Sequence, residues 1–120
     1  MSHGRFDKPP ETMKRSADGE SVEACGPLRW DGDDPNDRPA QRLTIQRVEI
    51  KQGRARAMRD PSQQFQRGEG GPDWMVPSIP SDGSAAFEDG RAHAEAEVEV
   101  VLEDGQVTTE RWRETVELSH

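Results

Sequence analysis

The sequence predicts an all-β fold, a small antiparallel β-sandwich or open barrel with an extended, irregular N-terminal arm. Two stretches carry this prediction: a dense run of β-branched residues at 43–51 and a strict apolar–polar alternation at 92–102. The third observation is the set of prolines in the first 42 residues, because proline blocks helices and ladder hydrogen bonds. The length of 120 residues fits one small domain.

Residues 1–42 are expected to form the arm and to be disordered unless bound to a partner. They hold only three of the 18 Leu, Ile, Val and Phe residues, and no apolar period spans them. The β domain is therefore expected at 43–120. Phe6, Leu28 and Trp30 are isolated apolar or aromatic side chains of the kind that anchors an arm on a partner.

Residues 43–51 are predicted to be the first strand of a hairpin. The apolar parity changes within this run, which a β-bulge or burial on both faces explains. A two-residue loop at Gln52-Gly53 would turn the chain and pair Ile50 with Ala55.

The stretch 60–90 has no clear periodicity and is expected to be a long irregular loop, interrupted by proline and glycine. Its apolar residues Trp74, Met75, Val76 and Ile79 indicate one short strand or docked segment within it.

The last hairpin is predicted in detail by its register. A two-residue loop at Asp104-Gly105 would set Trp112 against Glu97, so the apolar faces of the two strands would disagree. A three-residue loop, which begins at Glu103, sets Trp112 against Ala96 instead, and the faces agree. It also places Gly105 at the last loop position, where a left-handed residue is required. We therefore expect the three-residue loop.

Charge is unevenly distributed along a chain whose net charge is −8. Residues 42–68 hold seven basic and two acidic residues, whereas 69–120 hold three basic and thirteen acidic ones. The two hairpins are therefore expected to complement each other. The acidic total argues against a nucleic-acid partner, and the basic segment lacks the interleaved aromatics that stack on bases. The seven basic residues are Arg42, Arg47, Lys51, Arg54, Arg56, Arg59 and Arg67.

No pattern in the sequence predicts an enzyme, a metal site or a cofactor. Cys25 is the single cysteine, so an internal disulfide and a cysteine-rich zinc site are excluded. The acidic turn 31–37 lacks the calcium-loop spacing, and the glycines at 68–71 lack the Lys-Ser/Thr of a phosphate loop. His3, His93 and His120 have no convergent partners.

These observations favour a non-enzymatic structural subunit of a larger homo- or hetero-oligomeric assembly, whose β core docks while the arm and the 60–90 loop clamp neighbours. A virion component, such as a capsid-decorating or head–tail joining protein, has this architecture. The alternative is a small accessory or ligand-binding β module of an enzyme complex. With no apolar span and no signal-peptide pattern, the chain is expected in the cytoplasm or in an assembled particle, without a membrane partner. The candidate partner contacts are Phe6, Leu28, Trp30, Trp74, Met75, Arg54, Arg56 and Arg59.

Overall fold

Strands account for all the regular structure that was found. The computed structural model of the chain describes residues 5–6, 12–32, 38–68, 70, 72–82 and 85–120. Within these ranges there are eight strands and no helix, which confirms the all-β class. The strands are β1 (Thr12–Arg15), β2 (Ser21–Pro27), β3 (Ala40–Gln52), β4 (Ala55–Arg59), β5 (Gln63–Gln66), β6 (Asp73–Pro80), β7 (Gly90–Leu102) and β8 (Val107–Ser119).

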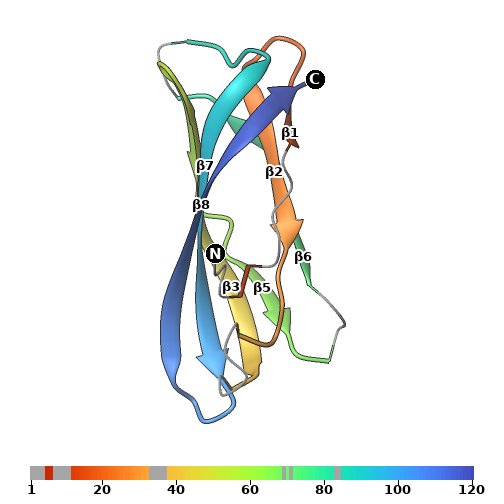
Figure 1. The fold of residues 1–120 in the computed structure, drawn as a ribbon, viewed down its shortest axis with the longest axis vertical. Coiled ribbons are helices and arrows are strands. Elements are labelled where there is room, and N and C mark those ends of the chain that lie inside the picture. The colour runs from red at the N-terminus through yellow and green to blue at the C-terminus, as the bar shows by residue number, and fades with distance from the viewer. Residues whose placement is uncertain (1–4, 7–11, 33–37, 69, 71, 83–84) are drawn as a thin grey trace.

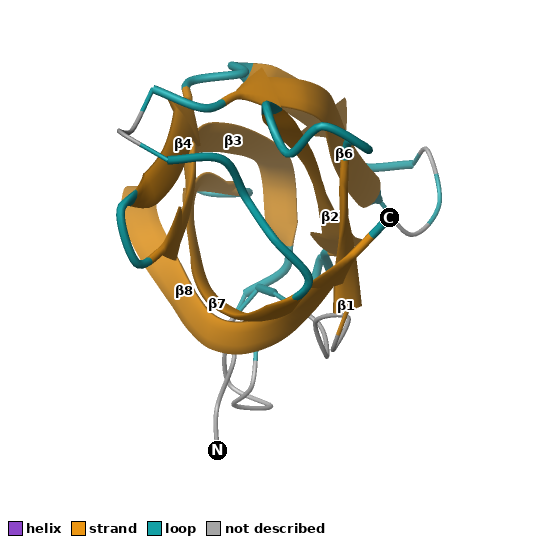
Figure 2. Cartoon of the chain, turned by 90° about the horizontal axis from the view of Figure 1, so that it is seen from above, coloured by secondary structure: helices purple, strands orange, loops and turns teal. Residues whose placement is uncertain are grey.

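The described strands form one sheet in the order β4-β3-β7-β8-β1-β2-β6, and β5 pairs with β3 beside β4. The β1–β8 pair is parallel and the other pairs are antiparallel. Figure 1 shows the long β7 and β8 crossing the molecule, and Figure 2, from above, shows the sheet curling round on itself. Of the two forms that the sequence allowed, the chain adopts the open barrel.

Bulges in β3 help this sheet to curl. The β3–β7 register shifts by one residue between Ala40 and Arg42 and again between Ile45 and Arg47. A bulge adds an unpaired residue, bends the strand and increases its twist. The second shift also explains why Leu43, Ile45, Val48 and Ile50 can all face the core. Of the two explanations for the change of parity, it confirms the bulge.

The C-terminal hairpin has the predicted three-residue loop. Trp112 lies opposite Ala96 and Val116 opposite Ala92. Gly105 has a φ of 88°, the left-handed value that the last loop position requires. Because Ala96 is small, the large Trp112 ring opposite it fits on the core face.

The register predicted for the first hairpin is wrong by two residues. Ile50 pairs with Ala57 rather than with Ala55, and the two-residue loop is Gly53-Arg54 rather than Gln52-Gly53. This shift places Gly53, with a φ of 59°, at the first loop position, where a two-residue hairpin turn needs a positive φ. A shift of two keeps every side chain on its face, so the apolar pattern could not distinguish the two registers.

The N-terminal segment contains more structure than an irregular arm. In its described part β1 pairs with β8 and with β2, and β2 pairs with β6. Met13, Val22 and Ala24 point into the core from these strands. Such short strands bury too few apolar residues to give an apolar period that can be seen in the sequence. Their position is fixed instead by hydrogen bonds to strands that are distant in the sequence. The disorder of residues 1–42 without a partner remains a prediction.

The stretch 60–90 likewise contains two strands, β5 and β6. The short strand expected around Trp74 is present as β6, and Trp74, Val76 and Ile79 face the core from it. Residue Phe87, near the end of this stretch, is also buried, and its N–H donates to the Gly19 carbonyl at 2.8 Å.

Candidate functional site

The aromatic and apolar residues expected to contact a partner occupy three environments. Phe6, Leu28 and Trp74 are each at most 3% exposed and belong to the core of this chain. Trp30 is half-buried and its indole N–H donates to the Gly70 carbonyl at 2.6 Å. Met75 is 52% exposed, so it alone of these five presents a large apolar surface to solvent.

The three arginines of the candidate set all come from the β4 hairpin. Arg54 lies in the loop, and Arg56 and Arg59 are exposed residues of β4. Arg56 is engaged with Glu49 within the chain. Arg54 and Arg59 make no ion pair with any described residue, so their charges remain available.

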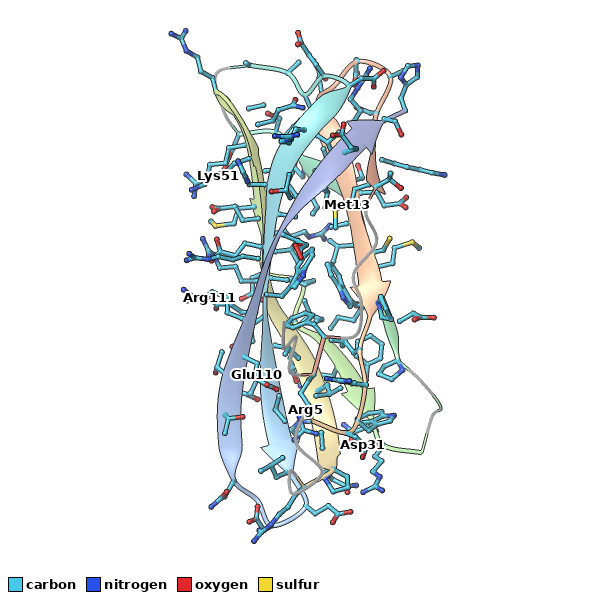
Figure 3. All side chains as sticks on the ribbon, in the orientation of Figure 1. Arg5, Met13, Asp31, Lys51, Glu110 and Arg111 are labelled. Atoms are coloured by element: carbon cyan, nitrogen blue, oxygen red, sulfur yellow. The ribbon has the colours of Figure 1, made fainter. Side chains whose placement is uncertain are left out.

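A network of ion pairs covers the outer side of β4, β3, β7 and β8. Alternate side chains of each strand point away from the core, and on these strands most of them are charged. Figure 3 shows Lys51 and Arg111 on this side of the sheet. We call this surface the charged face; it comprises Arg47, Glu49, Lys51, Arg56, Glu95, Glu97, Arg111 and Arg113.

Glu49 is the most enclosed member of the charged face, with 3% of its surface exposed. Its carboxylate oxygens lie 3.2 Å from Arg47 Nη2, 3.3 Å from Lys51 Nζ and 3.1 Å from Arg56 Nη2. Burial alone would raise the pKa of this carboxyl, but the hydrogen bonds and positive charges of the three neighbours outweigh it and lower the pKa. Glu49 is therefore ionised at neutral pH and is no proton donor.

The glutamates of β7 take part in the same network. Glu95 Oε1 lies 3.4 Å from Arg113 Nε and 3.6 Å from Arg47 Nη1. Glu97 accepts a hydrogen bond from Arg111 at 2.6 Å. Of the expected ion pairs between the basic and acidic hairpins, those of Arg47 with Glu95 and Glu97 are present, whereas Arg111 and Arg113 pair with glutamates of their own hairpin.

An open depression of about 520 Å³ lies in the charged face. Glu49, Lys51, His93, Glu95 and Arg113 contribute to its lining, together with Glu114 and Thr115. Both signs of charge are present, and the cations that neutralise Glu49 also hold its carboxylate in place. This arrangement suits the binding of a small polar molecule better than proton transfer.

The second notable feature is a seam where the barrel does not close. We use this name for the facing edges of β4–β5 and β6. Ala57 and Ser81 form an isolated bridge at one end of it. Farther along, the Met75 N–H is bonded to the side-chain Oε1 of Gln63 at 3.4 Å, in place of a main-chain carbonyl. No ladder joins β5 to β6 in the described part of the chain.

Prolines explain why the seam stays open. Pro61 separates β4 from β5 and Pro77 lies within β6, and neither has an N–H to donate. Both prolines lie between the Ala57–Ser81 bridge and the Gln63–Met75 contact, so they interrupt the same part of the seam. Each is followed by a serine with positive φ, 47° at Ser62 and 57° at Ser78, which departs from strand geometry. A continuous ladder cannot form across such a site.

The remaining reactive side chains do not converge on a site. Cys25 is half-buried, and burial together with Glu23 and Asp73 raises the pKa of its thiol, which disfavours the reactive thiolate. His120 Nδ1 lies 3.5 Å from Asp89, at the surface. Among the described residues, no three His, Cys, Asp or Glu side chains are placed to hold a metal ion.

Some positions singled out in the sequence lie outside the described residues. These are His3, residues 33–37 of the acidic turn, and Glu69 and Gly71 of the glycine-rich segment. Sequence reasoning missed the seam and its outward-facing Met58. The signal for it was the Pro-Ser dipeptides at 61–62 and 77–78, and the sequence does not show that they lie along the same seam.

Neither the models of known protein families nor the curated proteins include a match to this chain.

Proposed function

We propose that this chain is a non-enzymatic structural subunit of a larger protein assembly, and that its barrel docks on a protein partner along the seam. The observation that carries this proposal is that the edges of β5 and β6 face each other along the seam without forming a ladder. Unpaired strand edges are templates for pairing with an extended segment of another chain.

Exposed methionines on both sides of the seam add to this argument. Met58 on β4 is 42% exposed and Met75 on β6 is 52% exposed. Methionine adapts its shape to a partner and is frequent in the cores of interfaces. The free charges of Arg54 and Arg59 on the same hairpin favour an acidic segment of the partner.

Other observations favour binding over catalysis. The carboxylates of the charged face are bonded to cations of the same chain, and the Cys25 thiol has a raised pKa.

No described helix has the length and apolar character to span a membrane. Such a subunit would reside in the cytoplasm or in an assembled particle, with proteins as its partners.

The test is the size of the complex that contains the chain in its natural host. Tagged wild-type chain is expected to elute in a complex well above its own 13.4 kDa, and Met75→Lys is expected to shift it towards the free chain. Gln106→Lys, which adds the same charge in the exposed β7–β8 loop, is the control and should leave the complex intact. Elution of the wild-type chain alone would refute the proposal.

A ligand-binding module is the second candidate, and the depression in the charged face favours it. A polar small molecule bound beside Lys51 and Arg113 would raise the melting temperature of the chain. Lys51→Ala should abolish that rise. If no compound in a broad panel of charged metabolites shifts the melting temperature, this candidate is excluded.

A further inference from the structure

A second open depression, of about 430 Å³, lies between the β3–β4 loop and the segment that leads into β7. The loop contributes Gly53 and Arg54 to its lining, and the segment contributes residues 85–86 and 88–91. Several of these residues are glycine or alanine, so little side-chain volume fills the space. The volume falls within the range of about 300–1,000 Å³ that is usual for small-molecule sites.

Two cations without partners line this depression. They are Arg54 and Arg91, and neither side chain forms an ion pair or a hydrogen bond with a described residue. Most of the other described arginines do pair with a carboxylate. The chain has 24 Asp and Glu residues against 16 Lys and Arg residues, so a shortage of carboxylates does not explain the difference. Two unpaired guanidinium groups at one depression therefore indicate an anion-binding site.

Gln52 holds together the two segments that carry these arginines. Its Nε2 donates to the Glu88 carbonyl at 2.9 Å and to the Arg91 carbonyl at 3.3 Å. Its Oε1 accepts a hydrogen bond from the Glu88 N–H at 2.8 Å. The main chain beside Arg54 is thus joined to that of Arg91 before any ligand binds, which lowers the cost of ordering the site.

Two carboxylates of the lining restrict which anion can bind. Asp89 lies 2.9 Å from Arg15 Nη2, so its charge is largely compensated. Glu88 is exposed, and water and salt screen its charge. Two guanidinium groups complement the charge of a phosphate group, about −1.5 to −2 at neutral pH, better than that of a single carboxylate.

We propose that this depression binds the phosphate group of a small molecule, with Arg54 and Arg91 donating to the phosphate oxygens. The planar guanidinium group donates two parallel hydrogen bonds to such oxygens. A phosphate group fills only part of the volume, and the remainder, beside Ala85 and Ala86, receives the organic part of a phosphomonoester. The site is distinct from the depression in the charged face and goes beyond the proposed function.

The test is a titration of the isotope-labelled full chain with inorganic phosphate, followed by amide NMR at an ionic strength held constant with KCl. The amide resonances of Gly53 and Gly90 should shift and reach saturation. Arg54→Gln and Arg91→Gln should each weaken phosphate binding by about tenfold or more. Both side chains are exposed and make no contact of their own within the described chain, so both variants should fold.

Arg59→Gln is the matched control, because Arg59 is also an exposed arginine without an ion pair but does not line the depression. It removes the same charge and should leave phosphate binding unchanged. Equal weakening by Arg59→Gln would show a general attraction to positive charge and would overturn the site, as would the absence of saturable shifts.

Malonate, a small dicarboxylate, tests the assignment to phosphate. Binding of malonate as tight as that of phosphate would overturn that assignment, whereas weaker binding supports it. Each of these results leaves the proposed function standing, since that function is tested by the elution of the chain from its host.

Discussion

Glu49 is the residue whose replacement tests the electrostatics of this barrel most sharply. Glu49→Gln preserves the shape of the side chain and one acceptor oxygen but removes the charge that three cations surround. Loss of one member of a fully buried ion pair costs about 3–5 kcal/mol. Here the side chains of Arg47, Lys51 and Arg56 are 33%, 57% and 46% exposed, so they regain water when the carboxylate is lost.

The expected loss is therefore closer to that of one hydrogen bond to a charged group, about 1.5–3 kcal/mol at pH 7. The pKa of Glu49 is lowered in the folded chain, so its stabilisation is fully present above its ordinary value of about 4.5. It is lost as the pH falls through the folded-state pKa. The difference between wild type and Glu49→Gln should shrink accordingly under acidic conditions.

Urea unfolding followed by tryptophan fluorescence at pH 7 and pH 3 measures this difference directly. Glu95→Gln is the matched control: its carboxylate is more exposed, its nearest cation lies at 3.4 Å, and its loss should cost less than about 1 kcal/mol. Equal stability of Glu49→Gln and wild type at pH 7 would refute the reasoning. A deficit that is the same at both pH values would show that packing, not charge, is responsible.

Two further predictions concern single contacts. Phe6→Ala should cost less than the loss of a fully embedded phenylalanine, about 3–5 kcal/mol, because residues 5–6 can detach while the barrel stays folded. Amide exchange should then accelerate at Arg29, whose N–H donates to the Arg5 carbonyl, but not at Leu28, whose N–H donates to the Pro72 carbonyl. Equal acceleration at both amides would contradict this. Gln52→Ala should lower the free energy of unfolding by about 1–2 kcal/mol, because the Gln52 amide donates to the Glu88 carbonyl and accepts from the Glu88 N–H. A melting temperature equal to that of the wild type would count against this prediction.

The β7–β8 hairpin could be predicted to the residue because one register satisfies both the loop and the buried face. Of the two loop lengths compared, only the three-residue loop, which sets Trp112 opposite Ala96, brought the apolar faces into agreement. The β3–β4 hairpin could not, because registers two residues apart bury the same side chains. There the conformation of Gly53 was decisive, and a sequence leaves open which of two loop positions a glycine takes.

The N-terminal strands and the seam were beyond sequence reasoning for a different reason. β1 and β2 are specified by pairing with β8 and β6, and such distant partners leave no local pattern. For the same reason Phe6 and Leu28 read as isolated apolar points in the sequence, although each is the other's partner in the core. Part of the charge complementarity of the two hairpins could be predicted, since it follows from the charge content of segments that pair.

The parallel pairing of β1 with β8 has a consequence for synthesis of the chain. Thr12–Lys14 hydrogen-bond with Glu117–Ser119, so the first strand has no sheet neighbour on that side until the last has left the ribosome. During translation β1 therefore waits for over a hundred residues to be made, a delay of several seconds at about 5–20 residues per second. The barrel is completed only after its C-terminal strand emerges, and until then β1 can pair only with β2.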